Sequence, residues 1–148
     1  MDQKVTFPSG DLTLEGRVWL ATGSRGIGVV LCHPHPLRGG NMYSNVVSAV
    51  AEALWQHDIA TLRFNFRGVG ASGGEFDSGN GEIEDVLAIV RHAQQEYGDL
   101  PLILSGFSFG GYVQARAAQH LHPHPHRLVL IAPAVGRFAM PPVRHDSL

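Results

Sequence analysis

Four short runs of consecutive apolar residues recur along the chain, and each is typical of a strand buried on both faces of a parallel sheet. The runs are 28–32, 59–64, 102–104 and 128–132. The opening of the chain differs, because apolar and polar positions alternate over residues 12–17. Such alternation is typical of an antiparallel strand with one face in solvent. The pattern therefore predicts one antiparallel strand followed by four parallel strands.

Between these runs the apolar side chains recur at helical spacing. The segments that show this period are 44–57, 82–98 and 109–121. The stripe of the first segment that is expected to be buried consists of Val46, Val47, Val50 and Leu54. The second begins with acidic residues, which the helix dipole favours in a first turn, and it ends at a glycine. Helices are therefore expected between successive strands.

The order strand, helix, strand, helix specifies a single α/β domain over residues 1–148, with right-handed crossovers onto a mostly parallel sheet. Composition agrees with a packed domain, since 44% of the 148 residues are hydrophobic. The chain has 11 Lys and Arg residues against 13 Asp and Glu residues, and this near balance does not indicate binding to nucleic acid or to a membrane surface. The single Cys32, the polar N-terminus and the short apolar runs favour a cytoplasmic location.

The strongest chemical signal is Gly-Phe-Ser-Phe-Gly at 106–110, which follows an apolar strand and precedes a helical segment. Gly106 and Gly110 leave room where strand and helix approach, so Ser108 is able to occupy a strained turn with its hydroxyl exposed. A position at a helix N-terminus also favours the negative charge that develops during acyl transfer. The alternative is a serine that only caps the helix. The flanking strand and helix favour Ser108 as a catalytic nucleophile.

Three segments of the chain share a recognisable pattern. They are HPHPLRGGNM at 33–42, RFNFRGVGASGG at 63–74 and GFSFGG at 106–111. Together they resemble the α/β-hydrolase superfamily, and within it the small lidless bacterial serine hydrolases related to dienelactone hydrolases and simple esterases. The resemblance covers essentially the whole chain. It implies a three-layer α/β-hydrolase fold and hydrolysis of a small-molecule ester or related acyl substrate, with no cofactor.

The resemblance also implies an oxyanion hole built from two backbone N–H groups. Phe109, the residue after the nucleophile, supplies one of them. The two prolines of the loop at 33–40 have no N–H, so the second donor is His35 or Leu37. The His-Gly-x-Pro pattern of the family favours His35, with Leu37 as a candidate substrate contact. Alternatively, the histidines of this loop only brace a proline-rich segment.

A glycine-rich segment resembles a dinucleotide-binding motif but lacks its context. Gly68, Gly70 and Gly73 match G-x-G-x-x-G after an apolar strand. A helix should begin inside such a motif, yet residues 74–81 continue as loop. We therefore expect no nucleotide site and instead a loop that borders the active site, with Arg67 as a candidate substrate contact or a solvated side chain.

Histidines alternate with prolines between residues 122 and 126, a composition typical of weak metal-binding tracts. No carboxylate or thiolate accompanies His122, His124 and His126 nearby. The tract also lies in a connection between a helix and a strand, far from the face of Ser108. We therefore expect an exposed loop at this place, and no metal is assigned to the chain.

The catalytic triad of α/β-hydrolases follows the chain order Ser, acid, His. After the run at 128–132 the sequence contains one histidine, His145, and one carboxylate, Asp146. Adjacent residues in a terminal tail are poorly placed to act as a base for Ser108. The resemblance therefore implies that this chain is the N-terminal two-thirds of a hydrolase domain, without the last strands and helix, and that its activity is impaired.

Two functions follow from these patterns. The first is a serine hydrolase that forms an acyl-enzyme on Ser108. The second is a non-catalytic module that binds an acyl ligand or a partner chain. The run at 128–132 contains no lysine, glutamate or proline and is expected at an edge of the sheet, so it also predicts self-association through that edge.

Overall fold

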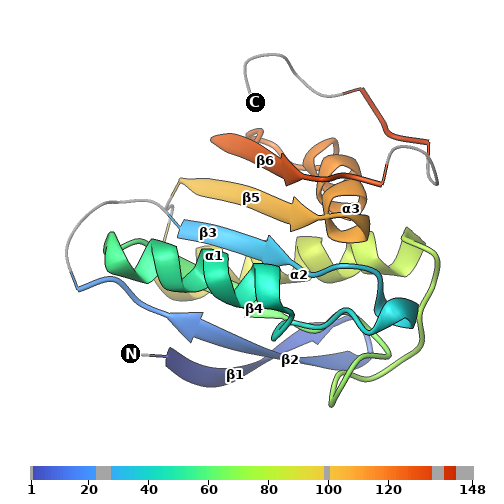
Figure 1. The fold of residues 1–148 in the computed structure, drawn as a ribbon, viewed down its shortest axis with the longest axis horizontal. Coiled ribbons are helices and arrows are strands. Elements are labelled where there is room, and N and C mark those ends of the chain that lie inside the picture. The colour runs from blue at the N-terminus through green and yellow to red at the C-terminus, as the bar shows by residue number, and fades with distance from the viewer. Residues whose placement is uncertain (1, 23–27, 99–100, 135–138, 143–148) are drawn as a thin grey trace.

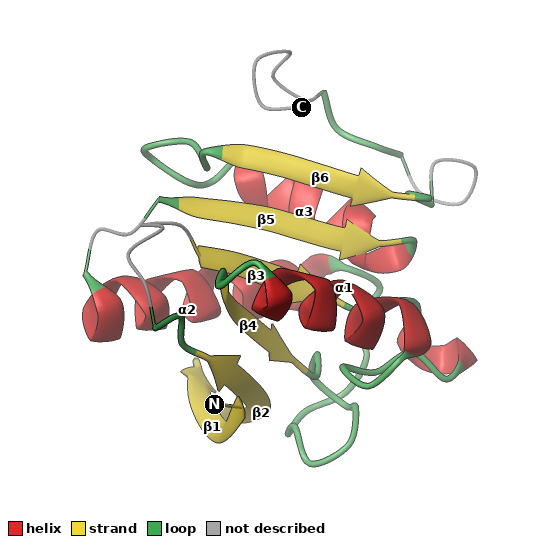
Figure 2. Ribbon diagram, turned by 60° about the vertical axis from the view of Figure 1, so that its left-hand side comes forward, coloured by secondary structure: helices red, strands yellow, loops and turns green. Residues whose placement is uncertain are grey.

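The computed structural model describes residues 2–22, 28–98, 101–134 and 139–142 of the chain. In this part, six strands form one sheet in the order β1-β2-β4-β3-β5-β6 (Figures 1 and 2). The strands are β1 (Asp2–Ser9), β2 (Leu12–Trp19), β3 (Gly28–Cys32), β4 (Ala60–Phe64), β5 (Leu102–Phe107) and β6 (Arg127–Ile131). The helices are η1 (Pro36–Arg38), α1 (Asn45–Gln56), α2 (Asn80–Tyr97) and α3 (Phe109–Ala118).

The sheet is mostly parallel. β1 pairs antiparallel with β2, and β2 pairs antiparallel with β4. From β4 through β3 and β5 to β6, neighbouring strands are parallel. The predicted α/β class is therefore confirmed, and the four apolar runs become β3 to β6 with ends shifted by no more than a few residues.

Helices cover both faces of the sheet, with α1 on one face and α2 and α3 on the other (Figure 1). Successive side chains of a strand point to opposite faces, and β3 serves both layers. Its Val30 joins the large cluster beneath α2 and α3. Its Val29 and Leu31 pack with Val47 and Ala51 of α1. The core is thus two layers divided by the sheet.

α1 presents a slightly different face to the sheet than the sequence pattern predicts. Val47 is buried as expected, but Val46 is 37% exposed. Ala51 takes the second buried position, four residues after Val47, which is the spacing of one helical face. Val50 and Leu54 are partly buried and pack against the same cluster. The predicted stripe was therefore right for three of its four residues and wrong for Val46.

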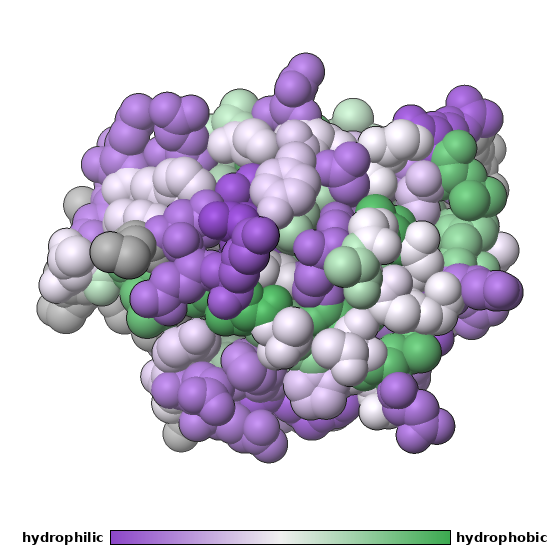
Figure 3. Space-filling view, turned by 90° about the horizontal axis from the view of Figure 1, so that it is seen from below, coloured by the Kyte–Doolittle hydropathy of each residue, from purple (hydrophilic) through white to green (hydrophobic). Residues whose placement is uncertain are grey.

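The two edges of the sheet present different surfaces. Seen from the side of β1 and β2, the molecule is mostly hydrophilic, with hydrophobic side chains in small separate areas (Figure 3). At the other edge, Leu128 of β6 is buried but Val129 is 45% exposed and Ile131 37% exposed. None of the helices in the described ranges is long and apolar enough to cross a membrane.

Candidate active site

Ser108 occupies a tight turn between β5 and α3, at the carboxyl end of the parallel strands. Its φ of 54° and ψ of −115° form a backbone conformation that costs of order 1–3 kcal/mol for a residue with a side chain. The Ser108 N–H donates to the carbonyl of Ile131 at 3.0 Å, and its carbonyl accepts from Gly111 N–H at 3.0 Å. The side chain makes no capping hydrogen bond to α3. Ser108 is thus the half-buried N-cap residue of α3, and its hydroxyl is not used to cap the helix.

Two glycines allow α3 to begin this close to the sheet. A Cβ atom on Gly110 would lie 2.5 Å from the carbonyl oxygens of both Cys32 and His33. A Cβ atom on Gly106 would overlap the backbone of Gly110. Larger residues would push α3 away from the ends of β3 and β5. The glycines of the motif therefore hold the start of α3 against the loop that follows β3.

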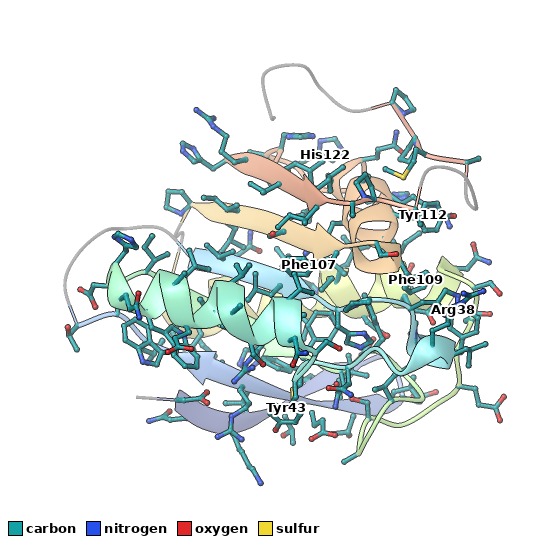
Figure 4. All side chains as sticks on the ribbon, in the orientation of Figure 1. Arg38, Tyr43, Phe107, Phe109, Tyr112 and His122 are labelled. Atoms are coloured by element: carbon teal, nitrogen blue, oxygen red, sulfur yellow. The ribbon has the colours of Figure 1, made fainter. Side chains whose placement is uncertain are left out.

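That loop folds back toward α3 through the short helix η1. The ring of His35 lies 5.1 Å from the ring of Phe76 and 5.0 Å from the ring of Phe109, measured between centroids. His35 Nδ1 accepts a hydrogen bond from Leu37 N–H at 3.2 Å, and the Leu37 side chain is 70% exposed. The labelled side chains of Phe109 and Arg38 lie at the same end of the sheet, where the β5 arrow ends (Figure 4). The structure thus brings together His35 and Phe109, the two residues predicted to flank the oxyanion.

His33 connects the loop after β3 to the loop after β4. Its side chain is fully buried, with Nε2 accepting from Phe66 N–H at 3.1 Å and Nδ1 within 2.7 Å of the carbonyl of Pro34. The neutral tautomer with its proton on Nδ1 satisfies both bonds. Burial lowers the pKa of His33 from its ordinary 6.5 to about 4. Both ring nitrogens are therefore engaged in the neutral form, and His33 acts as a brace.

Arg67 begins the loop after β4 and is held by a buried carboxylate of α2. Asp85, fully buried, accepts from the Arg67 backbone N–H at 3.0 Å, from its guanidinium at 2.7 Å and from Ser9 Oγ at 2.8 Å. The guanidinium lies against Gly81, where a Cβ atom would collide with it. The structure thus gives Arg67 a bracing role, and the contact with substrate suggested by the sequence stays a prediction.

A second buried carboxylate of α2 holds the far end of the same loop. Glu82 accepts from the backbone N–H groups of Asp77 and Gly79 at 2.9 and 3.0 Å. Burial raises the pKa of Glu82, and these hydrogen bonds partly oppose that rise. The loop so anchored carries Phe76, whose ring contacts His35. The sequence indicated the acidic first turn of this helix but not that its carboxylates hold the loop bordering the site.

No helix begins within the glycine-rich segment at 68–74 or directly after it, because α2 begins only at Asn80. The backbone N–H of Ala71 donates to the carboxylate of Glu15. Asn65 Nδ2 donates to the same carboxylate at 3.0 Å. This segment is therefore tied to β2 through Glu15, which agrees with the sequence argument against a dinucleotide site.

No described side chain hydrogen-bonds to the hydroxyl of Ser108. His145 and Asp146, the pair weighed as a base, lie outside the described residues. Within the described ranges, there is no cluster of three or more His, Cys, Asp or Glu side chains that could bind a metal ion. The site therefore consists of a strained serine and a braced loop, with the ring of His35 in contact with the ring of Phe109.

Similarity to known proteins agrees with this geometry. The family model described as serine aminopeptidase, S33, matches residues 27–145. An α/β serine hydrolase without a lid from Xanthomonas campestris superposes with a TM-score of 0.87 and 37% identity, covering 97% of this chain and 66% of that one. An uncharacterized protein of Rickettsia prowazekii is 34% identical over 134 residues, which cover 90% of this chain and 56% of that protein.

A more distant solved structure, an esterase from Pyrococcus furiosus, superposes with a TM-score of 0.80 at 25% identity, covering 91% of this chain and 51% of that one. The chain thus spans between about half and two-thirds of the length of these proteins. The resemblance to small lidless serine hydrolases is confirmed. Because the family model matches most of the chain, the chain belongs to the hydrolase family described as serine aminopeptidase, S33.

Proposed function

We propose that this chain carries the nucleophile and the oxyanion donors of a serine hydrolase that acts on carboxylic esters or related acyl substrates. The observation that carries the proposal is the backbone of Ser108, strained at φ 54° between β5 and α3, with a hydroxyl that does not cap the helix. Such a conformation persists only where the surroundings hold it, and it is typical of functional residues. Membership of a hydrolase family supports the same assignment.

In the proposed reaction, Ser108 Oγ attacks the substrate carbonyl carbon and gives its proton to a base, while the carbonyl oxygen becomes an oxyanion. The backbone N–H groups of Phe109 and His35 donate to that oxygen. Leu37 was the alternative donor, but its N–H donates to the His35 ring, which supports His35. Collapse releases the alcohol, which takes the proton from the base, and water then hydrolyses the ester left on Ser108.

The described residues provide no base for this step. The Ser108 hydroxyl has no hydrogen-bond partner among them, and both ring nitrogens of His33 are engaged. Removing the triad histidine of a serine hydrolase lowers kcat by about a million-fold. We therefore expect the 148-residue chain to acylate slowly and to turn over poorly.

Esters are proposed ahead of amides because an alkoxide can leave a tetrahedral intermediate without prior protonation, whereas an amine nitrogen leaves only after a general acid has protonated it. One neighbour is named an esterase, while the family description names an aminopeptidase. Alanine p-nitrophenyl ester and alanine p-nitroanilide, which share the same acyl group, would compare the two leaving-group classes directly. A preference for the anilide would contradict the ester assignment without affecting the role of Ser108.

A non-catalytic module that binds an acyl ligand or a partner chain is the second candidate. The Ser108 hydroxyl has no hydrogen-bond partner among the described residues, which favours this candidate, since a nucleophile in a working triad is hydrogen-bonded to its base. The two candidates differ in one chemical property. Only the hydrolase assignment requires that Ser108 become covalently acylated or phosphonylated.

The test is prolonged reaction with an excess of a fluorophosphonate, followed by peptide mass spectrometry. We expect one slow adduct on Ser108, its absence from Ser108→Ala, and its persistence in Ser78→Ala, which removes an exposed serine of the nearby loop. An equal adduct in Ser108→Ala would refute the nucleophile. A fast adduct would show that a base is present, and no adduct at any dose would favour the binding module.

A further inference from the structure

A cavity lies at the opposite end of the sheet from Ser108. Its volume is about 700 Å³, and its walls are one face of α2, the start of β5 and the connection from α3 to β6. That connection reaches the sheet where the β5 and β6 arrows begin (Figure 2). The six residues of β5 separate this end from Ser108 by roughly 20 Å. The volume falls in the range of cavities that bind small molecules.

The α2 wall of the cavity is apolar at its base and polar at its mouth. Leu87, Val90, Arg91 and Gln94 line it, and their spacing places them on one helical face. Val90 and Leu102, which both line the cavity, are buried members of the main core. Arg91 and Gln94 are exposed. A ligand with one apolar and one polar end fits this gradient.

The opposite wall, residues 120–126, is fixed to the rest of the molecule at both of its ends. The N–H of His120 donates to the carbonyl of Ala117 at 2.9 Å. The N–H of His126 donates to the carbonyl of Leu102 at 2.9 Å. Prolines at alternate positions further restrict this segment. The wall is therefore largely formed before any ligand binds.

The polar lining of the cavity favours an anion. The described polar side chains that line it are Arg91, Gln94 and four histidines, all of which can donate hydrogen bonds, and there is no carboxylate among them. The Arg91 guanidinium makes no hydrogen bond or ion pair with another described residue. A cation with no partner among the described residues, beside an apolar base, matches a carboxylate attached to an apolar group.

We propose that this cavity binds a small apolar monocarboxylate. The carboxylate pairs with the Arg91 guanidinium at the mouth, with Gln94 and the histidines as further donors. The alkyl or aryl part lies against Leu87 and Leu121, both of which line the cavity. A metal ion does not suit the site, because the described imidazoles do not converge in a group of three. The proposal is independent of catalysis at Ser108.

Octanoate titrated into the 15N-labelled 148-residue chain tests this assignment by amide chemical shifts. We expect saturable shifts in 87–94 and 120–126 and none in 105–111. Arg91→Gln, a substitution at an exposed position, should weaken binding at least about tenfold because a charge-assisted pair is lost. Octanamide, the neutral isostere, should bind the wild-type chain about tenfold more weakly than octanoate.

Two matched controls separate this cavity from other anion-binding surfaces. Arg38→Gln removes an exposed cation near the other end of the sheet, and Ser108→Ala alters the candidate nucleophile; both should bind octanoate as the wild type does. The proposal would be overturned if the chemical shift changes mapped to 105–111, or if no saturable change appeared over the soluble range of octanoate. It would also be overturned if Arg91→Gln bound octanoate as tightly as the wild type, or if octanamide bound as tightly as octanoate.

Discussion

The two sides of the candidate nucleophile are built very differently. On one side, the loops after β3 and β4 are held by buried His33, Glu82 and Asp85, each of which makes two or more hydrogen bonds to these loops or to β1. On the other side, β6 contributes one backbone acceptor, the carbonyl of Ile131, and exposes the side chains of Val129 and Ile131. One side is a braced polar scaffold, and the other is an apolar strand at the edge of the sheet.

This difference separates two requirements of a serine hydrolase. Orientation of the nucleophile and of the oxyanion donors depends on rigid supporting contacts, and the braced side supplies these. Proton transfer depends on a basic side chain within hydrogen-bond distance of the serine, and no described residue of either side supplies one to Ser108. Preorganisation is therefore a property of the described fold, whereas the proposed activity also needs a base from elsewhere.

The largest effect is expected from removing the central carboxylate of the braced side. Asp85→Ala leaves the Arg67 N–H, its guanidinium and the Ser9 hydroxyl without their acceptor. Removing one partner of such a buried pair should lower the free energy of unfolding by about 4 kcal/mol, measured by urea denaturation. Glu84→Ala, on the exposed face of the same helix, should change it by less than about 0.5 kcal/mol. Equal effects of the two substitutions would contradict the bracing role of Asp85.

The strands show which parts of the fold a sequence reveals. β3 to β6 were predictable because a strand covered on both faces must be apolar at nearly every position. β1 was missed because its buried side chains are only Phe7 and Ser9, separated by Pro8, and because its pairing with β2 is a tertiary fact. A strand with one solvent face leaves a weak pattern when it is short of apolar residues.

The candidate site divides in the same way. Ser108 and its neighbours were predictable because the strand, the glycines and the helix that create the turn are contiguous. The roles of Asp85 and Phe76 were not predictable, because they depend on contacts between residues that are far apart in the sequence. Ser9 and Asp85, for example, are 76 positions apart. An acid near a helix start has an ordinary explanation in the helix dipole, and only packing of α2 against β1 reveals its burial.

A somewhat smaller effect is expected from protonating the braced side. The unfolded chain binds a proton on His33 near pH 6.5, but the folded chain does so only near pH 4. The stability that His33 contributes is therefore fully present above pH 6.5 and is lost as the pH falls to about 4. Over this range the loss should reach about 3 kcal/mol.

The control for this titration is His33→Gln, which cannot take up a proton and keeps an acceptor for Phe66 N–H. Carboxylates also titrate in this window, so the informative quantity is the difference between the two proteins in free energy of unfolding at each pH. That difference should narrow as the pH falls from 6.5 to 4. A difference independent of pH would mean that His33 is not held neutral by burial.

The last prediction concerns the two edges of the sheet and involves the smallest change in stability. It tests whether the apolar edge strand β6 mediates self-association. β1 carries Lys4 and Pro8, residues that discourage pairing with another chain. β6 carries neither lysine, glutamate nor proline, and it exposes Val129 and Ile131 on one face. The comparison predicts that copies of the chain self-associate through β6 and not through β1.

Val129→Lys should therefore abolish most of this association, because a charged side chain on an edge strand opposes pairing, while changing the free energy of unfolding by less than about 1 kcal/mol. Thr6→Lys places the same charge at an exposed position of β1 and should leave association unchanged. Sedimentation velocity over a range of concentrations measures both. The prediction would be contradicted if the wild-type chain stayed monomeric at every concentration, or if Val129→Lys associated as strongly as the wild type. The exposed side chains of β6 would then not form an interface between copies, and their exposure beside Ser108 would need another explanation.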